Sequence, residues 1–107
     1  MEQWEFRTQL RIGCGPAYIA THHAIPAALD AAMRAAGVAH WVIRRRGDIL
    51  THSVVAHARE QLRRDLDPHP ANRAWQAEVA PYLSSRDVTE DVSDPGDIIW
   101  SRSWNTR

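Results

Sequence analysis

The first residues of the chain alternate between mostly apolar and polar side chains. Trp4, Phe6, Thr8, Leu10 and Ile12 occupy the even positions, and glutamate, arginine and glutamine fill the positions between them. Because successive side chains of a β-strand point to opposite faces of a sheet, this period of two predicts a strand with one buried face. Such a face must be buried under another layer, so a sheet covered by helices is expected.

A helical pattern follows this strand. The segment Gly13-Cys14-Gly15-Pro16 ends the strand, and a proline suits the first turn of a helix. From residue 17 apolar side chains recur at helical spacing as far as Gly37, which supplies a stop. Pro26 lies inside this span and predicts a kink or a division of the helix, just after two adjacent histidines.

The rest of the chain predicts a hairpin, two more helices and a closing strand. We expect hairpin strands at 40–44 and 49–56, helices at 58–66 and 72–83, a polar, acidic loop at 84–96 and a final strand at 97–104. The order is therefore strand, helix, strand, strand, helix, strand. It predicts an α+β, ferredoxin-like βαββαβ fold, with an antiparallel sheet and helices on one face, as one domain over residues 1–107.

The second face of such a sheet also needs a cover. In a chain of 107 residues, a second copy of the chain is the expected solution, so we expect a homodimer. The terminal strands carry Trp4, Phe6, Trp100 and Trp104. These aromatic side chains are equally good candidates for the dimer surface and for the core of one subunit.

Composition excludes several classes of function. The 13 basic and 13 acidic residues balance, which gives no electrostatic basis for binding nucleic acid or an anionic membrane. All the basic residues are arginines, so Schiff-base chemistry through a lysine is excluded. A single cysteine, Cys14, allows no internal disulfide and fits a reducing cytoplasm. No apolar run is long enough to span a bilayer.

The chemically useful residues begin with Tyr18 and His22. Their spacing of four puts a phenol and an imidazole on one face of a helix. Imidazole exchanges protons near neutral pH, and Trp41 and Trp75 offer flat apolar walls. His52 is a possible second acid–base group. The structural alternatives are a buried histidine with satisfied hydrogen bonds and tryptophans that pack in the core. The six histidines show no metal-ligand spacing, so a metal site is not expected.

In their order these features resemble the L-rhamnose mutarotase family. The matching features are the opening strand, Tyr18-x-x-x-His22, Ile25 beside a proline, Leu29, Gly37, an aromatic residue four positions later, the hairpin, Arg73 with Trp75, and a closing aromatic strand. The resemblance implies a dimeric α/β barrel that interconverts the anomers of a monosaccharide without a cofactor. It also implies that His22 is the proton donor and that Tyr18, Trp41 and Trp75 contact the sugar.

The chain departs from the family pattern at three places. Ala74-Trp75 stands where the family has two tryptophans, Pro26-Ala27 stands where it has Trp-Pro, and Trp41 replaces a typical tyrosine. We therefore expect a pocket that lacks one wall and accepts L-rhamnose or a related pyranose. Two other functions fit the same architecture: a monooxygenase-like or haem-handling barrel, and a sugar-binding module without catalysis.

Overall fold

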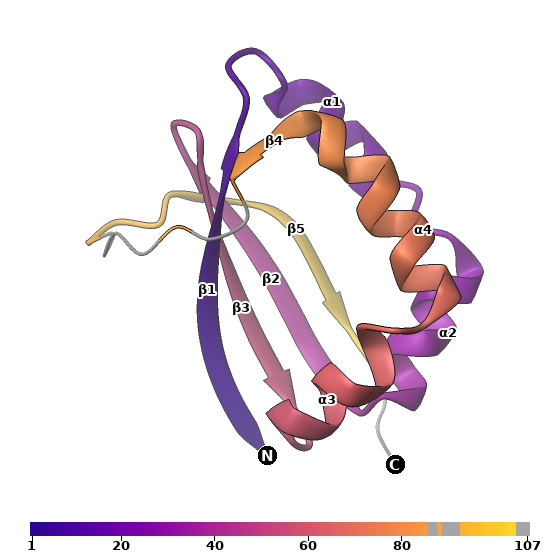
Figure 1. Ribbon diagram of the computed structural model, residues 1–107. Helices are drawn as coiled ribbons and strands as arrows, with labels where there is room; N and C mark the ends of the chain where they lie inside the picture. Colours follow the sequence, from indigo (N-terminus) through magenta and orange to yellow (C-terminus); the bar gives the residue numbers. More distant parts are fainter. Residues whose placement is uncertain (86–87, 89–92, 105–107) are drawn as a thin grey trace.

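The strands form one antiparallel sheet, which is one of the two layers of the molecule. The computed structural model describes residues 1–85, 88 and 93–104. Within this part, the strand order across the sheet is β4-β1-β3-β2-β5 (Figure 1). The strands are β1 (Glu2–Leu10), β2 (Val38–Arg46), β3 (Ile49–Ala56), β4 (Leu83–Ser85) and β5 (Asp97–Ser103).

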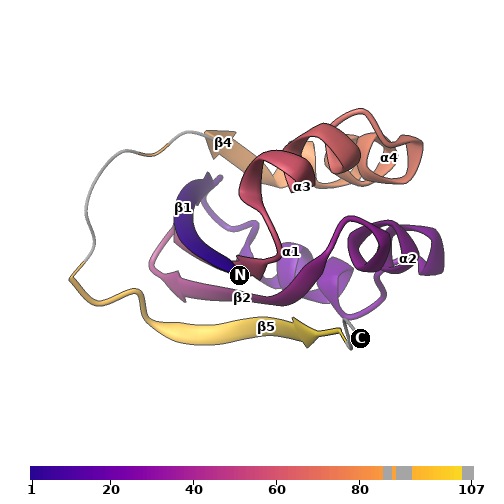
Figure 2. The same cartoon turned by 90° about the horizontal axis from the view of Figure 1, so that it is seen from below.

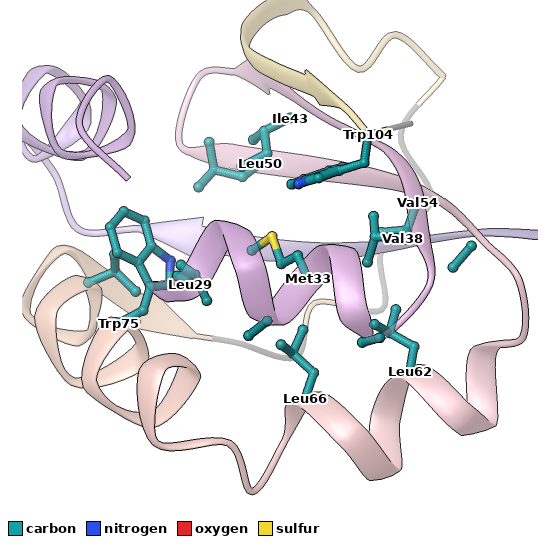
Figure 3. Packing of buried hydrophobic residues seen from close by; sticks show 14 of the residues in the cluster. Leu29, Met33, Val38, Ile43, Leu50, Val54, Leu62, Leu66, Trp75 and Trp104 are labelled. Atoms are coloured by element: carbon teal, nitrogen blue, oxygen red, sulfur yellow. The ribbon is translucent and has the colours of Figure 1, made fainter. Parts of the chain in front are cut away.

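The helices of the described residues form a second layer on one face of the sheet (Figure 2). They are α1 (Gly15–His22), α2 (Ala27–Ala35), α3 (Arg59–Leu66), α4 (Pro70–Val79) and the short 3₁₀ helix η1 (Ala80–Tyr82). Leu29 and Met33 of α2 are buried against this sheet face, together with Leu50 and Val54 of β3 (Figure 3). The core therefore lies between the two layers, and the predicted α+β, ferredoxin-like arrangement is confirmed.

The first helical span is divided where the sequence predicts. Helix α1 ends at His22, and Pro26 precedes α2 with an extended ψ of 141°. A proline has no N–H to donate to the preceding turn, and its ring restricts the residue before it, so it begins a new helix rather than continuing the old one. The division turns the chain immediately after His22 and leaves that residue at a helix end.

The closing strand of the βαββαβ unit is not the one predicted. The predicted helix over 72–83 ends at Val79, and η1 then leads into β4, which pairs with β1. Pro81 explains the early end, because a proline cannot hydrogen-bond back to the preceding turn. Residues 97–103 instead form β5, an additional strand on the opposite edge beside β2. Residues 86–87 and 89–92 of the predicted loop lie outside the described part.

Of the two places left open for the terminal aromatic residues, the structure supports the core of one subunit. Trp104 is buried in the core, while Trp4, Phe6 and Trp100 are half-buried on the face of the sheet that the helices cover. Ile12 was expected on the same buried face, but it lies beyond the end of β1 and is 92% exposed. The even positions of β1 therefore point toward the helices as far as Leu10 only.

A carboxylate of α2 holds the edge strand β5 in place. Oδ1 of Asp30 accepts hydrogen bonds from Arg102 Nε at 2.8 Å and from Trp104 Nε1 at 3.1 Å. The hydrogen bond from Arg102 is the main reason why the pKa of Asp30 is lowered. Because Arg102 lies in β5 and Trp104 directly follows it, this contact fixes the strand against the helix layer and sets the position of Trp100, two residues before Arg102.

Candidate active site

A cavity of about 310 Å³ lies between the sheet and the helices. This volume is at the small end of the range found for ligand sites in proteins. Its walls are largely apolar and aromatic, and two histidines are among the lining residues. The lining includes Phe6, Tyr18, His22, Trp41, His52, Trp75 and Trp100. All five residues that the sequence singled out for a site therefore line one cavity.

His22, the last residue of α1, is the histidine held by the helix layer. Its Nδ1 lies 2.9 Å from the carbonyl oxygen of Tyr18, one turn earlier in the helix. A carbonyl only accepts, so Nδ1 carries the proton and Nε2 is the unprotonated nitrogen. Burial is the main cause that lowers the pKa of His22, and the nearby His23 adds to the effect. The ring is therefore neutral at pH 7 and has one basic nitrogen.

Aromatic rings surround this imidazole. The ring centroid of His22 is 4.2 Å from that of Tyr18, 4.9 Å from that of Trp75 and 5.7 Å from that of Trp100. Trp75 and Trp100 both present an edge-to-face geometry. Trp75 also belongs to the buried core near Leu29 (Figure 3), so the same side chain packs in the core and forms a wall. The sequence did not identify Trp100 as a residue of the cavity wall. It lies there because it pairs with Ile43 of β2, which also lines the cavity.

His52, on the central strand β3, belongs to a second cluster on the sheet wall. Its Nδ1 accepts a hydrogen bond from Trp41 Nε1 at 3.3 Å, and its Nε2 lies 3.1 Å from Thr8 Oγ1. The ring of Phe6 stacks on it, with centroids 4.4 Å apart. Burial, with a smaller contribution from the charge of His22, lowers the pKa of His52 to about 3. His52 is therefore neutral over the physiological pH range.

Polar side chains of α3 and α4 also line the cavity. Asn72 is buried, and its Oδ1 accepts a hydrogen bond from Gln76 at 3.3 Å. Glu60 and Arg63 form an exposed ion pair on α3, and Arg59 lies over the ring of Trp4. Amide and charged groups of this kind match the hydroxyl groups of a small polar ligand, whose apolar face would meet the aromatic side chains.

One expectation about α4 needs correction. Ala74 and Arg73 are both exposed and do not line the cavity. Because Trp75 points inward, its neighbour at position 74 points about a hundred degrees away around the helix. The alanine therefore removes no wall from the cavity of this chain. Trp100 supplies the additional aromatic side chain next to His22.

Comparison with known proteins identifies the family. A family model described as L-rhamnose mutarotase matches residues 3–102. The chain belongs to the L-rhamnose mutarotase family. A protein of Sinorhizobium medicae (strain WSM419) named L-rhamnose mutarotase is 31% identical over 97 residues, which cover 89% of this chain and 92% of that protein. A protein of the same name from Rhizobium meliloti (strain 1021) is 31% identical over 96 residues, with the same coverage.

The resemblance seen in the sequence is thus confirmed, and the match extends over nearly the full chain. Within the part of the chain that the structure describes, no three histidine, cysteine, aspartate or glutamate side chains are grouped so that they could hold a metal ion. Among the same residues, no helix has the length and apolar character needed to span a membrane.

The buried state of His52 predicts a loss of stability in mild acid. The unfolded chain protonates this residue below about pH 6.5, while the folded chain keeps it neutral down to a pKa of about 3. The unfolded state then binds more protons, so the free energy of unfolding falls as the pH falls through this window. Between pH 7 and pH 5 the contribution of His52 is about 2 kcal/mol.

Urea denaturation at the two pH values measures this loss in wild type and in His52→Asn. The asparagine does not titrate, and every other group is unchanged, so the variant should lose about 2 kcal/mol less than wild type. An equal loss in both proteins would show that His52 is not held neutral in the folded state.

Proposed function

We propose that this chain is a sugar mutarotase that interconverts the α and β anomers of L-rhamnose or a related neutral pyranose. The observation that carries the proposal is the state of His22. It is a neutral imidazole with a fixed tautomer, enclosed by Tyr18, Trp75 and Trp100 in a cavity of small-ligand size. The family to which the chain belongs supports the same activity.

The reaction moves one proton between two oxygens. Nε2 of His22 takes the proton of the anomeric hydroxyl, and the imidazolium so formed gives a proton to the ring oxygen. The bond between C1 and the ring oxygen breaks while the carbonyl at C1 forms. Rotation about the C1–C2 bond turns the aldehyde, and the reverse steps close the ring on its other face. Since both oxygens are bonded to the same carbon, a single nitrogen can reach each of them in turn.

The lowered pKa of His22 suits this exchange. A neutral ring is ready to accept a proton at pH 7, and the imidazolium that forms in a buried site is a stronger acid than in water. Tyr18, Trp41 and Trp75 form the binding surface in this proposal, and we add Trp100 to them. The apolar C–H faces of a pyranose would lie against their rings, and the amides of α4 would meet its hydroxyls.

Two alternatives from other functional classes receive less support. A monooxygenase-like barrel would use the cavity for an aromatic substrate or haem, and a non-catalytic module would bind a sugar without exchanging its anomers. Family membership favours neither of them. They differ from the mutarotase in one measurable respect, because neither accelerates anomer exchange.

We also propose where this protein acts and how it assembles. We expect residues 1–107 to act as one domain in the cytoplasm, where the thiol of Cys14 stays reduced. We also expect a homodimer formed through the sheet face opposite the described helices. The alternation of the strands puts Val42 and Val55 on that face, beside polar residues such as Ser53 and Ser101.

Substitution of His22 tests the reaction directly. His22→Ala should reduce anomer exchange of L-rhamnose by about a hundred- to ten-thousandfold, which is the range for positioned acid–base catalysis. Magnetisation-transfer NMR near pH 7 measures the exchange rate. His23→Ala is the matched control, because His23 is adjacent but exposed. Wild-type exchange in a folded His22→Ala protein would refute the proposed mechanism.

Trp100 of β5 and Trp104, which directly follows this strand, allow the cavity wall to be tested separately from the core. Trp100 is half-buried and lines the cavity, while Trp104 is buried and bonded to Asp30. Trp100→Ala should raise KM for the sugar with a modest loss of stability, whereas Trp104→Ala should destabilise the fold by about 3–5 kcal/mol. Exchange kinetics and urea denaturation of both variants make the comparison. Equal KM values in wild type and Trp100→Ala would remove Trp100 from the binding surface.

The proposed dimer is tested by mass in solution. Size-exclusion chromatography with light scattering should give roughly twice the 12.1 kDa of one chain. Val55→Glu would place a charge within the proposed interface and should shift the protein toward the monomer, since an unpaired buried charge is costly. Ile12→Glu, at an exposed position beyond β1, is the control and should leave the mass unchanged. A monomeric wild type would contradict the dimer.

A further inference from the structure

We propose that His52 is a positioning residue that holds the indole of Trp41 in one orientation at the cavity wall, through a hydrogen-bonded chain that runs from Trp41 through His52 to Thr8. This inference rests on the proposed function and deepens it. In the reaction, the fixed indole would set the position of the sugar relative to His22. We call the three residues the indole clamp.

The chemistry of the three groups fixes the direction of the clamp. The indole N–H of Trp41 only donates, so the Nδ1 of His52, 3.3 Å away, accepts. The other nitrogen, Nε2, therefore carries the proton of the neutral ring and donates it to Thr8 Oγ1 at 3.1 Å. The hydrogen bond from Trp41 thus fixes the tautomer of His52, and this tautomer fixes the direction of the hydrogen bond to Thr8. Rotation of the Trp41 indole away from this position would leave a buried nitrogen of His52 without a partner.

The strands around His52 make the clamp rigid. Phe6 of β1 pairs with His52 of β3 across the sheet, and their rings stack at an interplanar angle of 11°. Phe6 also meets the Trp41 ring edge-on, with centroids 6.0 Å apart. Trp41, on β2, lies diagonally across from His52, whose direct partner on that strand is Ile43. Three neighbouring strands therefore support the three rings, and cross-strand pairs of this kind stabilise one register.

Both ring nitrogens of His52 are hydrogen-bonded within the clamp, whereas the Nε2 of His22 is the basic nitrogen of the proposed reaction. A proton could reach Nδ1 only if the hydrogen bond from Trp41 were broken, and burial opposes the charge that would result. His52 is thus poorly suited to the role of second proton carrier.

The clamp also determines what Trp41 offers to a sugar. Its indole N–H is already bonded to His52, so the residue offers the sugar a flat apolar face and no hydrogen-bond donor. Such a wall favours pyranoses that present an unbroken C–H or methyl surface.

Three substitutions separate the parts of the clamp. His52→Leu removes both hydrogen bonds while it keeps an apolar side chain in place. His52→Asn is the conservative control, because its amide oxygen can occupy the place of Nδ1 and accept from Trp41. Trp41→Phe keeps an aromatic wall and removes the N–H. All three are first checked for cooperative unfolding in urea.

The first readout tests the clamp without any sugar. In the ¹⁵N–¹H spectrum, the indole signal that is missing from Trp41→Phe belongs to Trp41. In wild type and His52→Asn this N–H should exchange slowly with solvent, and in His52→Leu it should exchange about tenfold faster or more, as expected for the loss of one hydrogen bond. Equal exchange in all these proteins would overturn the clamp.

The second readout tests its role in the reaction. His52→Leu should raise KM for L-rhamnose about tenfold and leave kcat within about twofold, because the sugar is held less well while His22 is intact. His52→Asn should restore most of the affinity. A fall in kcat with unchanged KM would overturn the inference and make His52 a proton carrier. If His52→Leu does not fold, Thr8→Val breaks the other hydrogen bond of the clamp and should produce the same pattern in a weaker form.

The two readouts distinguish the failure of each proposal. Absence of anomer exchange by wild type on every pyranose tested would overturn the proposed function and the role of the clamp in it, whatever the NMR result. Exchange by wild type that His52→Leu leaves unchanged in both KM and kcat would overturn the clamp alone.

Discussion

The interior depends on two imidazoles, His22 and His52, that are buried without an ion-pair partner among the residues the structure describes. Each is kept neutral by burial, and each has its N–H satisfied by a near neighbour. For His22 the acceptor is the carbonyl of Tyr18 within α1, and for His52 it is the hydroxyl of Thr8 across the sheet. The tautomer of His22 is therefore fixed within one helix, and that of His52 across paired strands. Neither imidazole relies on the opposite layer for its tautomer.

A third contact brings those layers to a fixed separation. Asp30 of α2 ties β5 to the helix layer, and β5 carries Trp100 to within 5.7 Å of the His22 ring. The edge strand lies far from α1 in sequence but beside it in space. Its aromatic side chain completes the enclosure of an imidazole that belongs to the other layer. The contact between Asp30 and Arg102 is partly exposed, so its share in stability is modest, and its main effect is on geometry.

How much the sequence predicts depends on whether the information is local. The period of two in β1 and the helical spacing of Tyr18 and His22 lie within one element, and both predictions are confirmed by the structure. Strand β4 has only three residues, too few to show any periodicity, and its place beside β1 is set by pairing with a segment distant in sequence. The partners of His52 likewise follow from strand register, which a single sequence does not specify.

Burial of His22 has opposite effects on the two halves of the proposed reaction. It lowers the basicity of Nε2, which slows the removal of the anomeric proton, and it raises the acidity of the imidazolium, which speeds the transfer to the ring oxygen. Mutarotation as a whole releases and consumes no proton, and ring closure repeats the same two steps in reverse order. A single group with a pKa below its usual value therefore serves both directions, and no second titrating residue is required to balance the proton that His22 takes up.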